Sequence, residues 1–422
     1  MTLLTSKKNP QLFSNIVCII CACMVPLLVT GPFLPDLIVS LSSIFFLYYT
    51  IKNKIYTIYR NTYFYLFIFF WLICILSSLL SDNILISLRS SLFYVRIGIF
   101  ALLISYLIDQ NKKILDYFYY AFCFTFSALV IDGYFQYITG TNLFGYKMYD
   151  EIRISSFFGK ELILGSYLSR LFPLFFALFI ARVNKKPIEI CFISILYILI
   201  DVLIFLAGER ASFFFFNLST IFIILFISKY KLLRVGLFII SIIIIFFLTL
   251  NDSKLYERYI ASPIKSMGLK NDNINQENKD KKLYLFTPVH DSLFKTAYNM
   301  FLHKPILGHG PKLFRIKCHD LKYAVGDTPC DQHPHNFYFQ LLAETGIIGF
   351  SFLLGLFLYV IYLSIKHIIE YLKYKKYFLS DYQICLLGGL LITAWPFTSN
   401  GSIFTNYLML FYSLQIGFFK KT

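Results

Sequence analysis

Long apolar stretches separated by short polar turns run along almost the whole chain. A helix needs about 20 apolar residues to cross roughly 30 Å of hydrocarbon, and stretches of about this length recur. The pattern predicts twelve membrane-spanning helices, at 12–30, 34–51, 63–80, 91–108, 114–134, 162–181, 188–206, 211–228, 233–250, 341–363, 382–398 and 402–419. The first stretch lacks a small-residue cleavage site, so we expect it to be retained and not removed as a signal peptide.

Composition agrees with this pattern. The chain has 422 residues, of which 58% are hydrophobic and 19% aromatic, and its mean hydropathy of +0.66 lies above that of soluble globular proteins. We therefore predict an all-α, polytopic membrane protein. Its expected divisions are nine spans in 1–250, a large outer loop in 251–340 and three more spans in 341–422.

The positive charges fall in alternate loops. A net charge of +16 could suggest nucleic-acid binding, but the cations do not form one patch. In the twelve-span arrangement the following lie on a single side: Lys7, Lys8, Lys52, Lys54, Arg60, Lys112, Lys113, Arg182, Lys185, Lys186, Lys229, Lys231, Arg234, Lys366, Lys373, Lys375, Lys376, Lys420 and Lys421. This positive-inside pattern predicts that both termini are cytoplasmic. Chemistry is then expected in the outer segments 81–90, 135–161, 208–210 and 251–340.

The outer loop 251–340 divides by composition. Residues 266–283 are polar and predict a mobile connector. Residues 287–305 predict an amphipathic helix on the membrane face, with Thr287 as N-cap and Pro288 in the first turn. Gly308 and Gly310 then predict a sharp turn.

Two of the nine cysteines lie in this loop, at Cys318 and Cys330. A disulfide between them would suit an oxidising compartment and would hold the segment before the histidines, although spacing alone leaves two free thiols as the alternative. A zinc site that adds His319, His333 and His335 matches no standard ligand spacing. The other seven cysteines lie in predicted spans, where thiols pack as small hydrophobes.

Three ionisable residues lie inside predicted spans: Arg96, Arg170 and Asp132. A charge in a span costs at least about 2.5 to 3.5 kcal/mol, so it usually has a partner or faces a polar cavity. One interpretation is mutual neutralisation, for example of Asp132 by an arginine. The other is that the arginines bind an anionic ligand.

The "GER" turn at 208–210 interrupts two apolar stretches. Glu209 and Arg210 could form a solvated hairpin. Few other cations lie near the outer ends of the spans, namely Arg89, Lys147, Arg153 and Lys160. Because a guanidinium group matches the geometry of phosphate oxygens, several converging arginines would hold a diphosphate without a metal.

His335 lies at the start of an apolar helix. It could simply cap that helix, which is expected to begin near Asn336. Its imidazole could instead act as a general base or acid, because imidazoles as a class change charge near neutral pH. The outer loops contain no Asp-x-Asp pair and the chain contains no P-loop, so the sequence supports neither a metal-dependent nor an ATP-driven reaction.

Five segments together resemble the bacterial O-antigen ligase and polymerase superfamily in order, spacing and side of the membrane. They are "QYITGTNLFGY" (136–146), "RISSFFGKELILGSYLSRLFP" (153–173), "GER" (208–210), "HKPILGHGPKLFR" (303–315) and "HPHNFYFQLLAETGIIG" (333–349). The resemblance covers about residues 60–415 and is most specific in the last two segments.

The resemblance implies a glycosyltransferase with GT-C-like architecture and a large periplasmic loop. Such ligases move a glycan from undecaprenyl diphosphate to a sugar hydroxyl of the lipid A core, at the periplasmic face of the inner membrane, with no cofactor and no metal. It implies that His335 activates the acceptor hydroxyl and that Arg210 engages the diphosphate. The candidate substrate-binding residues are Arg153, Arg96, Glu209, Asn336, Lys160 and Arg170.

Three alternative functions remain from the sequence. A polymerase would join carrier-linked repeat units to one another and shares much of the motif set, although the single block from Val289 to Glu344 favours a ligase. Enzymes that transfer the glycan to a protein acceptor also belong to the same superfamily. A non-enzymatic glycolipid transporter would place polar groups near the membrane midplane, whereas here they gather at the outer boundary.

Overall fold

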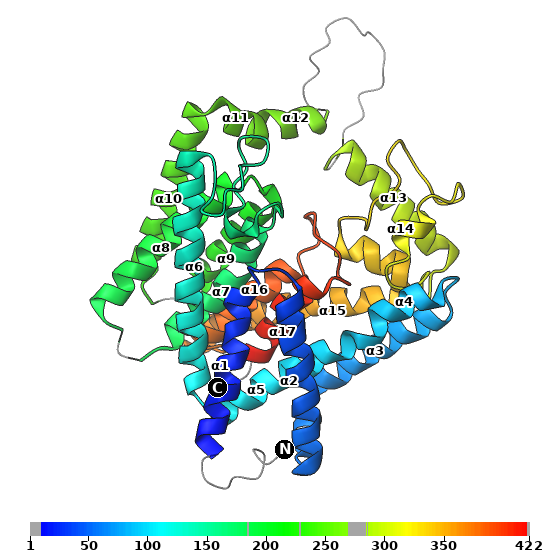
Figure 1. Ribbon diagram of the computed structural model, residues 1–422, viewed down its shortest axis with the longest axis horizontal. Helices are drawn as coiled ribbons and strands as arrows, with labels where there is room; N and C mark the ends of the chain where they lie inside the picture. The colour runs from blue at the N-terminus through cyan, green and yellow to red at the C-terminus, as the bar shows by residue number, and fades with distance from the viewer. Residues whose placement is uncertain (1–9, 184, 228, 269–283, 285, 420–422) are drawn as a thin grey trace, which may run out of the picture.

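The computed structural model describes residues 10–183, 185–227, 229–268, 284 and 286–419, and the regular secondary structure in this part of the chain is helical apart from two isolated β-bridges (Figure 1). The elements are α1 (Pro10–Leu27), α2 (Phe33–Lys52), η1 (Tyr56–Tyr59), α3 (Thr62–Leu79), α4 (Ile84–Ser91), η2 (Leu92–Tyr94), α5 (Val95–Gln110), α6 (Lys113–Thr139), η3 (Ser156–Phe158), α7 (Leu164–Ala181), α8 (Pro187–Leu206), α9 (Arg210–Phe226), α10 (Lys231–Asn251), α11 (Ser253–Tyr256), η4 (Glu257–Ala261), α12 (Ser262–Ser266), α13 (Pro288–His303), α14 (Phe314–Lys317), α15 (Phe337–Tyr374), α16 (Asp381–Thr393) and α17 (Asn406–Phe418).

Eight helical stretches within the described residues are long and apolar enough to cross a membrane. They are α2, α3, the continuous stretch Ile84–Gln110, α6, α7, α8, α10 and α15. Shorter apolar helices are Ser14–Leu27, α9 and α16. The prediction of an all-α, multi-pass membrane protein is thus confirmed, whereas the count of twelve spans is not.

The last two predicted spans, 382–398 and 402–419, are shorter in the structure. Helix α16 ends at Thr393 and α17 begins only at Asn406. Thirteen residues of helix extend about 20 Å at 1.5 Å per residue, which is less than a bilayer core. Both helices instead lie in the middle of the molecule, α16 against α7 and α9, and α17 against α5 (Figure 1). The non-helical segment between them, residues 394–405, becomes part of the site described below.

Ion pairs connect loops that the charge pattern assigned to the same side. Arg182, in a predicted cytoplasmic turn, pairs with Asp116 at 2.5 Å and with Glu189 at 3.3 Å, which lie at the cytoplasmic ends of the neighbouring predicted spans. Lys254 pairs with Glu151 at 2.9 Å, and these two residues lie in predicted outer loops. The loops therefore group as expected, while the orientation of the bundle in a membrane stays a prediction.

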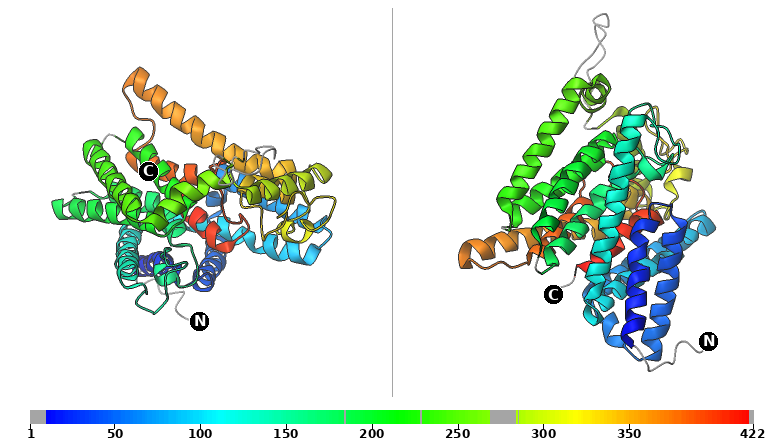
Figure 2. Two further views of the ribbon diagram at one scale, coloured as in Figure 1. Left: turned by 90° about the horizontal axis from the view of Figure 1, so that it is seen from above. Right: turned by 60° about the vertical axis from the view of Figure 1, so that its left-hand side comes forward.

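Helix α15 is broken at Gly346, so the predicted span 341–363 extends across a break. Gly346 has φ 66° and ψ −164°, and the freed N–H of Ile347 donates to the carbonyl of Pro305 at 2.8 Å. A Cβ atom at Gly346 would overlap the carbonyl of Ile306. Beyond the break, α15 extends away from the rest of the bundle (Figure 2).

The turn predicted at Gly308 and Gly310 packs on the same helix. Gly308 and Gly310 have positive φ angles of 67° and 112°. The N–H groups of His309 and Gly310 donate to the carbonyls of Ala343 and Glu344, at 3.0 and 2.9 Å. The outer loop is thus fixed to the first part of α15 by backbone hydrogen bonds.

The amphipathic helix predicted at 287–305 is present as α13. The Thr287 side chain accepts from the N–H of His290, and Pro288 occupies the first turn. Its buried face joins a small second core, separate from that of the bundle, formed by Leu293, Ala297, Met300, Phe314, Cys318, Tyr323 and Ala343. Most of the connector predicted at 266–283 lies outside the described residues, as do Lys7, Lys8, Lys420 and Lys421.

The break in α15 gives a test of this packing. We expect Gly346→Ala to lower the melting temperature of the detergent-solubilised protein strongly, because the added Cβ meets backbone atoms at a positive φ angle. Gly355→Ala in the same helix is the matched control: nothing lies within 4 Å of its Cβ position, and alanine favours a helix by about 1 kcal/mol over glycine. Equal melting temperatures for the two variants would contradict this account.

Candidate active site

His335 is held beside a carboxylate. Its Nε2 lies 2.9 Å from Oδ2 of Asp331, and its side chain remains 35% exposed, so a ligand can reach it. When Nε2–H donates to Asp331, the carboxylate fixes the tautomer and leaves Nδ1 free to accept a proton. Burial would raise the pKa of Asp331, but the hydrogen bond from His335 and neighbouring positive charge lower it overall. The pair has the arrangement of an oriented general base.

The backbone of His335 adopts a conformation that is unusual for a residue with a side chain. Its φ angle is +56°, and such conformations persist only where the surroundings enforce them. The N–H of His335 donates to Nδ1 of His333 at 3.0 Å, and its carbonyl accepts from the N–H of Asn400 at 2.8 Å. These two bonds fix the backbone that carries the imidazole, and the bond to Asp331 fixes the ring itself.

Asn336 and Arg170, both predicted to bind substrate, support this geometry from inside. Asn336 is buried; its Oδ1 accepts from the N–H of Tyr338 at 2.9 Å as the N-cap of α15, and its amide donates to the carbonyl of Pro396 at 2.8 Å. Arg170 is 3% exposed and donates to Oδ1 of Asn400 at 2.8 Å. Because Asn400 in turn contacts His335, the structure places Arg170 behind the site.

Two further imidazoles surround His335. The ring centroid of His333 lies 4.2 Å from that of His335, and the ring of His290 on α13 lies 5.8 Å away. Burial lowers the pKa of His290, and so do the charges of His335 and Arg210. His290 is therefore an electrostatic neighbour of both residues that the sequence singled out. The sequence did not indicate His290, since "TPVHD" reads as an ordinary helix start.

Arginines converge on the turn that carries Arg210. Gly208 has a φ angle of +70°, and its carbonyl accepts from Nε of Arg258 at 2.7 Å. Nε of Arg153 donates to the carbonyl of Ala207 at 3.3 Å. Arg210 follows as the exposed first residue of α9. We call Arg153, Arg210 and Arg258 the arginine cluster.

The arginine cluster has the electrostatics of an anion site. Burial lowers the pKa of Arg153, and the charge of Arg258 lowers it further, because like charges in a half-buried place disfavour one another. A bound anion would relieve that repulsion. Beside Arg258 a surface groove of about 460 Å³ opens, lined by Ile152, Ser253, Lys254, Glu257, Arg258 and Ser262. Arg258 was missed in the sequence because only the folding of η4 brings it to the turn.

Glu209, also predicted to bind substrate, caps a helix in the structure. Its carboxylate accepts from the N–H groups of Gly165 and Ser166, at 2.8 and 3.0 Å, and from the hydroxyl of Ser212 at 2.9 Å. The first two belong to the N-terminal turn of α7, where a negative charge is favourable. Burial raises the pKa of Glu209, opposed by these hydrogen bonds and by Arg153. Glu209 thus fixes the arginine-bearing turn on α7.

The remaining predicted residues lie apart from His335. Arg96 forms an ion pair with Asp36 on α2 at 2.6 Å, so it is neutralised within the fold. Asp132 accepts from Ser156 Oγ at 2.7 Å and the N–H of Leu143 at 2.9 Å, and not from an arginine as the sequence suggested. Lys160 is exposed in the loop before α7.

Cys318 and Cys330 form a disulfide in the structure, with Cα atoms 5.1 Å apart. The segment it closes ends one residue before Asp331, and Cys318 is part of the second core. His319 lies near both sulfur atoms, but bonded sulfurs are not thiolate ligands for a metal. The disulfide therefore acts as a brace for the chain that enters the site.

Comparison with known protein families supports the resemblance. The family described as O-antigen ligase matches residues 193–354, which supports the superfamily resemblance found in the sequence. The matched region contains Glu209, Arg210, Arg258, His290 and His335, whereas Arg153, Arg170 and Asn400 lie outside it. Members of this family are membrane glycosyltransferase-like enzymes that act on lipid-linked glycans. No curated protein matches the chain.

The histidines give a pH test. Burial, and then the charge of His335, lower the pKa of His333 to about 4. An unfolded histidine titrates near about 6.5, so between these values the unfolded state binds more protons. Its contribution to stability is complete above about pH 6.5 and is lost as the pH falls toward 4.

We expect the melting temperature of His333→Asn to fall less than that of the wild type between pH 6.5 and 4. The amide oxygen of the new side chain can still accept from the N–H of His335. Burial also lowers the pKa values of His290 and His309, so part of the slope will remain. His319→Asn, at an exposed position, is the control and should keep the wild-type slope. An unchanged slope in His333→Asn would rule out this assignment.

Proposed function

Because residues 193–354 match the O-antigen ligase family, we propose that this protein is an O-antigen ligase. In this proposal it transfers a glycan from undecaprenyl diphosphate to a sugar hydroxyl of the lipid A core, at the periplasmic face of the bacterial inner membrane. The observation that carries the proposal is the His335–Asp331 pair, which His290 connects electrostatically to Arg210 in the arginine cluster.

The proposed reaction begins with the acceptor hydroxyl at His335. The imidazole takes the hydroxyl proton while the oxygen attacks the anomeric carbon, and Asp331 stabilises the imidazolium that forms. The bond from that carbon to the diphosphate oxygen breaks in the same displacement, which inverts the anomeric carbon. His290, a half-buried imidazole beside His335, helps to position the acceptor.

The arginine cluster receives the charge that develops on the leaving diphosphate. Fixed guanidinium groups stabilise such charge because their orientation is set before the reaction. They supply the positive charge that a metal provides in other transferases, so the proposal includes no metal and no cofactor. The lipid tail of the carrier lies against the apolar helices, and the termini of the protein are cytoplasmic. The GT-C-like architecture belongs to the same proposal.

The family match does not distinguish a ligase from a polymerase. Gene deletion separates them: loss of a ligase leaves long glycan on the carrier and bare lipid A core, whereas loss of a polymerase leaves single repeat units attached to the core. The block from Val289 to Glu344 favours the ligase. Transfer to a protein acceptor would appear in the same strains as glycoprotein loss with an intact lipopolysaccharide ladder.

The catalytic assignment predicts that His335→Ala and Arg210→Ala abolish glycan attachment in a deletion strain while the protein still inserts. General-base loss alone reduces rates by about 10²- to 10⁴-fold. Arg210→Lys should also be impaired, since it keeps the charge but loses the planar fork. Lipopolysaccharide gels measure glycan attachment, and immunoblots of membrane fractions measure insertion of the protein. His319→Ala, an exposed histidine of the same loop, should behave as wild type; full activity in the first two variants would remove the mechanism.

Arg258 gives a sharper test of the arginine cluster. With purified protein and carrier-linked glycan, we expect Arg258→Gln to raise KM for the donor by at least about tenfold, equivalent to ~1.4 kcal/mol of binding. Lys254→Gln is the matched control, because Lys254 lines the same groove but pairs with Glu151. If both variants raised KM equally, general surface charge would explain the effect and the cluster would not.

A further inference from the structure

A second polar site lies inside the bundle, away from the arginine cluster. Asp201 on α8 is fully buried. Its Oδ2 accepts from Ser241 Oγ on α10 at 2.6 Å, and its Oδ1 lies 3.4 Å from the side-chain amide of Asn217 on α9. Among the residues that the structure describes, no cation pairs with it. A buried carboxylate without a counter-charge is costly, and within a membrane such a residue usually marks a function.

Oxygen atoms around Asp201 lack hydrogen-bond partners. Within the described chain, the hydroxyls of Tyr197 and Thr220 and Oδ1 of Asn217 are buried and unpaired. Tyr197 and Thr220 are only 8% and 6% exposed. The Tyr197 phenol lies close enough to Asp201, Thr220 and Ser241 to interact electrostatically with them, but it makes no hydrogen bond of ordinary geometry. Buried polar atoms almost always have a partner, so unpaired ones indicate a missing water or ion.

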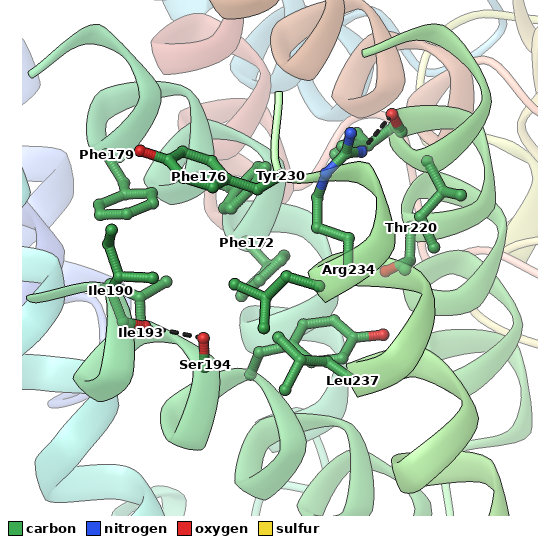
Figure 3. Close-up of a pocket in the computed structure, with 14 residues that line it drawn as sticks. Phe172, Phe176, Phe179, Ile190, Ile193, Ser194, Thr220, Tyr230, Arg234 and Leu237 are labelled. Carbon is green, nitrogen blue, oxygen red and sulfur yellow. Dashed lines mark hydrogen bonds between the residues drawn. The ribbon is translucent and has the colours of Figure 1, made fainter. Parts of the chain in front are cut away.

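A cavity reaches this cluster from the side. It has a volume of about 50 Å³ and lies between α7, α8, α9 and α10 (Figure 3). Its walls are mostly apolar, with Phe172, Phe176 and Leu237 among them. Tyr197 and Thr220 line its polar part next to the cluster, and Arg234, which donates to the carbonyls of Ile223 and Lys229, lines it as well. A single water needs roughly 10–15 Å³, so the cavity has room for water beside Tyr197 and Thr220, at the edge of the cluster around Asp201.

We propose that Asp201, Asn217, Tyr197, Thr220 and Ser241 bind a monovalent alkali cation such as Na⁺. All five offer oxygen atoms, the ligands that hard cations prefer. One carboxylate balances one positive charge, whereas a divalent ion would leave an uncompensated charge in apolar surroundings. A proton would neutralise Asp201 but would leave the other oxygen atoms without a partner.

The position of the site indicates what a bound cation would do. Its ligands come from α8, α9 and α10, and α8 and α9 are the two helices joined by the turn that carries Arg210. A cation shared by the three helices would hold them together below that turn. This inference does not depend on the proposed glycan transfer, because binding can be measured without activity.

The test is thermal unfolding of the full-length protein in detergent, with NaCl replacing choline chloride at constant ionic strength. A ligand that binds only the folded state raises the melting temperature with its concentration. We expect a saturable rise with Na⁺ that Asp201→Asn abolishes. Asp132→Asn is the control: Asp132 is equally buried, but hydrogen bonds to Leu143 and Ser156 satisfy it, and its variant should keep the Na⁺ response.

A second variant keeps the test decisive if Asp201→Asn fails to fold. Thr220→Val preserves shape and charge, and should shift the Na⁺ midpoint at least about tenfold, equivalent to ~1.4 kcal/mol. Measurements at pH 6 and 8 test the alternative that a proton, and not Na⁺, neutralises Asp201. The other titratable groups that face Asp201 are the phenols of Tyr134 and Tyr197. The proposal would be overturned if the melting temperature were the same in NaCl and in choline chloride. It would also be overturned if the melting temperature changed with pH alone.

Discussion

The contact between the outer loop and the break in α15 determines where the site can lie. At Gly346 the helix gives up its regular hydrogen bonding, and the chain from Pro305 to Gly310 takes its place with backbone bonds to Ile347, Ala343 and Glu344. Such close backbone contact requires glycine. It fixes α13 and the disulfide-braced segment over the start of α15, where His335 lies.

A second constraint comes from the interior. Residues 394–405 are not helical, and backbone of this kind is tolerated in a membrane protein only where protein or a polar cavity surrounds it. Here the segment is stabilised by contacts with Asn336 and with the backbone of His335, and Arg170 supports it through Asn400. The buried guanidinium group of Arg170 thus stabilises, through Asn400, the segment that orients His335.

The two halves of the site depend on different helices. The arginine cluster lies on the turn between α8 and α9, where Glu209 attaches it to α7. His335 depends on α13, α15 and residues 394–405. His290 connects the halves, because its ring contacts His335 and the positive charge of Arg210 lowers its pKa. A change in the packing of α13 would therefore alter the relation between His335 and the arginine cluster.

The sequence alone determined the class of the protein, since long apolar stretches have no stable place except a membrane or a large core. It also determined α13 and the Gly308–Gly310 turn, and it singled out His335 and Arg210 as candidates, because caps, glycines and isolated charges carry local signals. It did not determine the helix count at the C-terminus, where α16 and α17 are as apolar as spans but too short to cross.

Only the tertiary structure decided which charged residues have a role at the site. Arg96 and Glu209 have partners distant in sequence, at Asp36 and at the start of α7, and no local pattern encodes such pairs. Arg258, His290, Asp331 and Asn400 became part of the site for the same reason. Residue type sets what a group can do, but its charge is available to a ligand only where the fold leaves it unpaired.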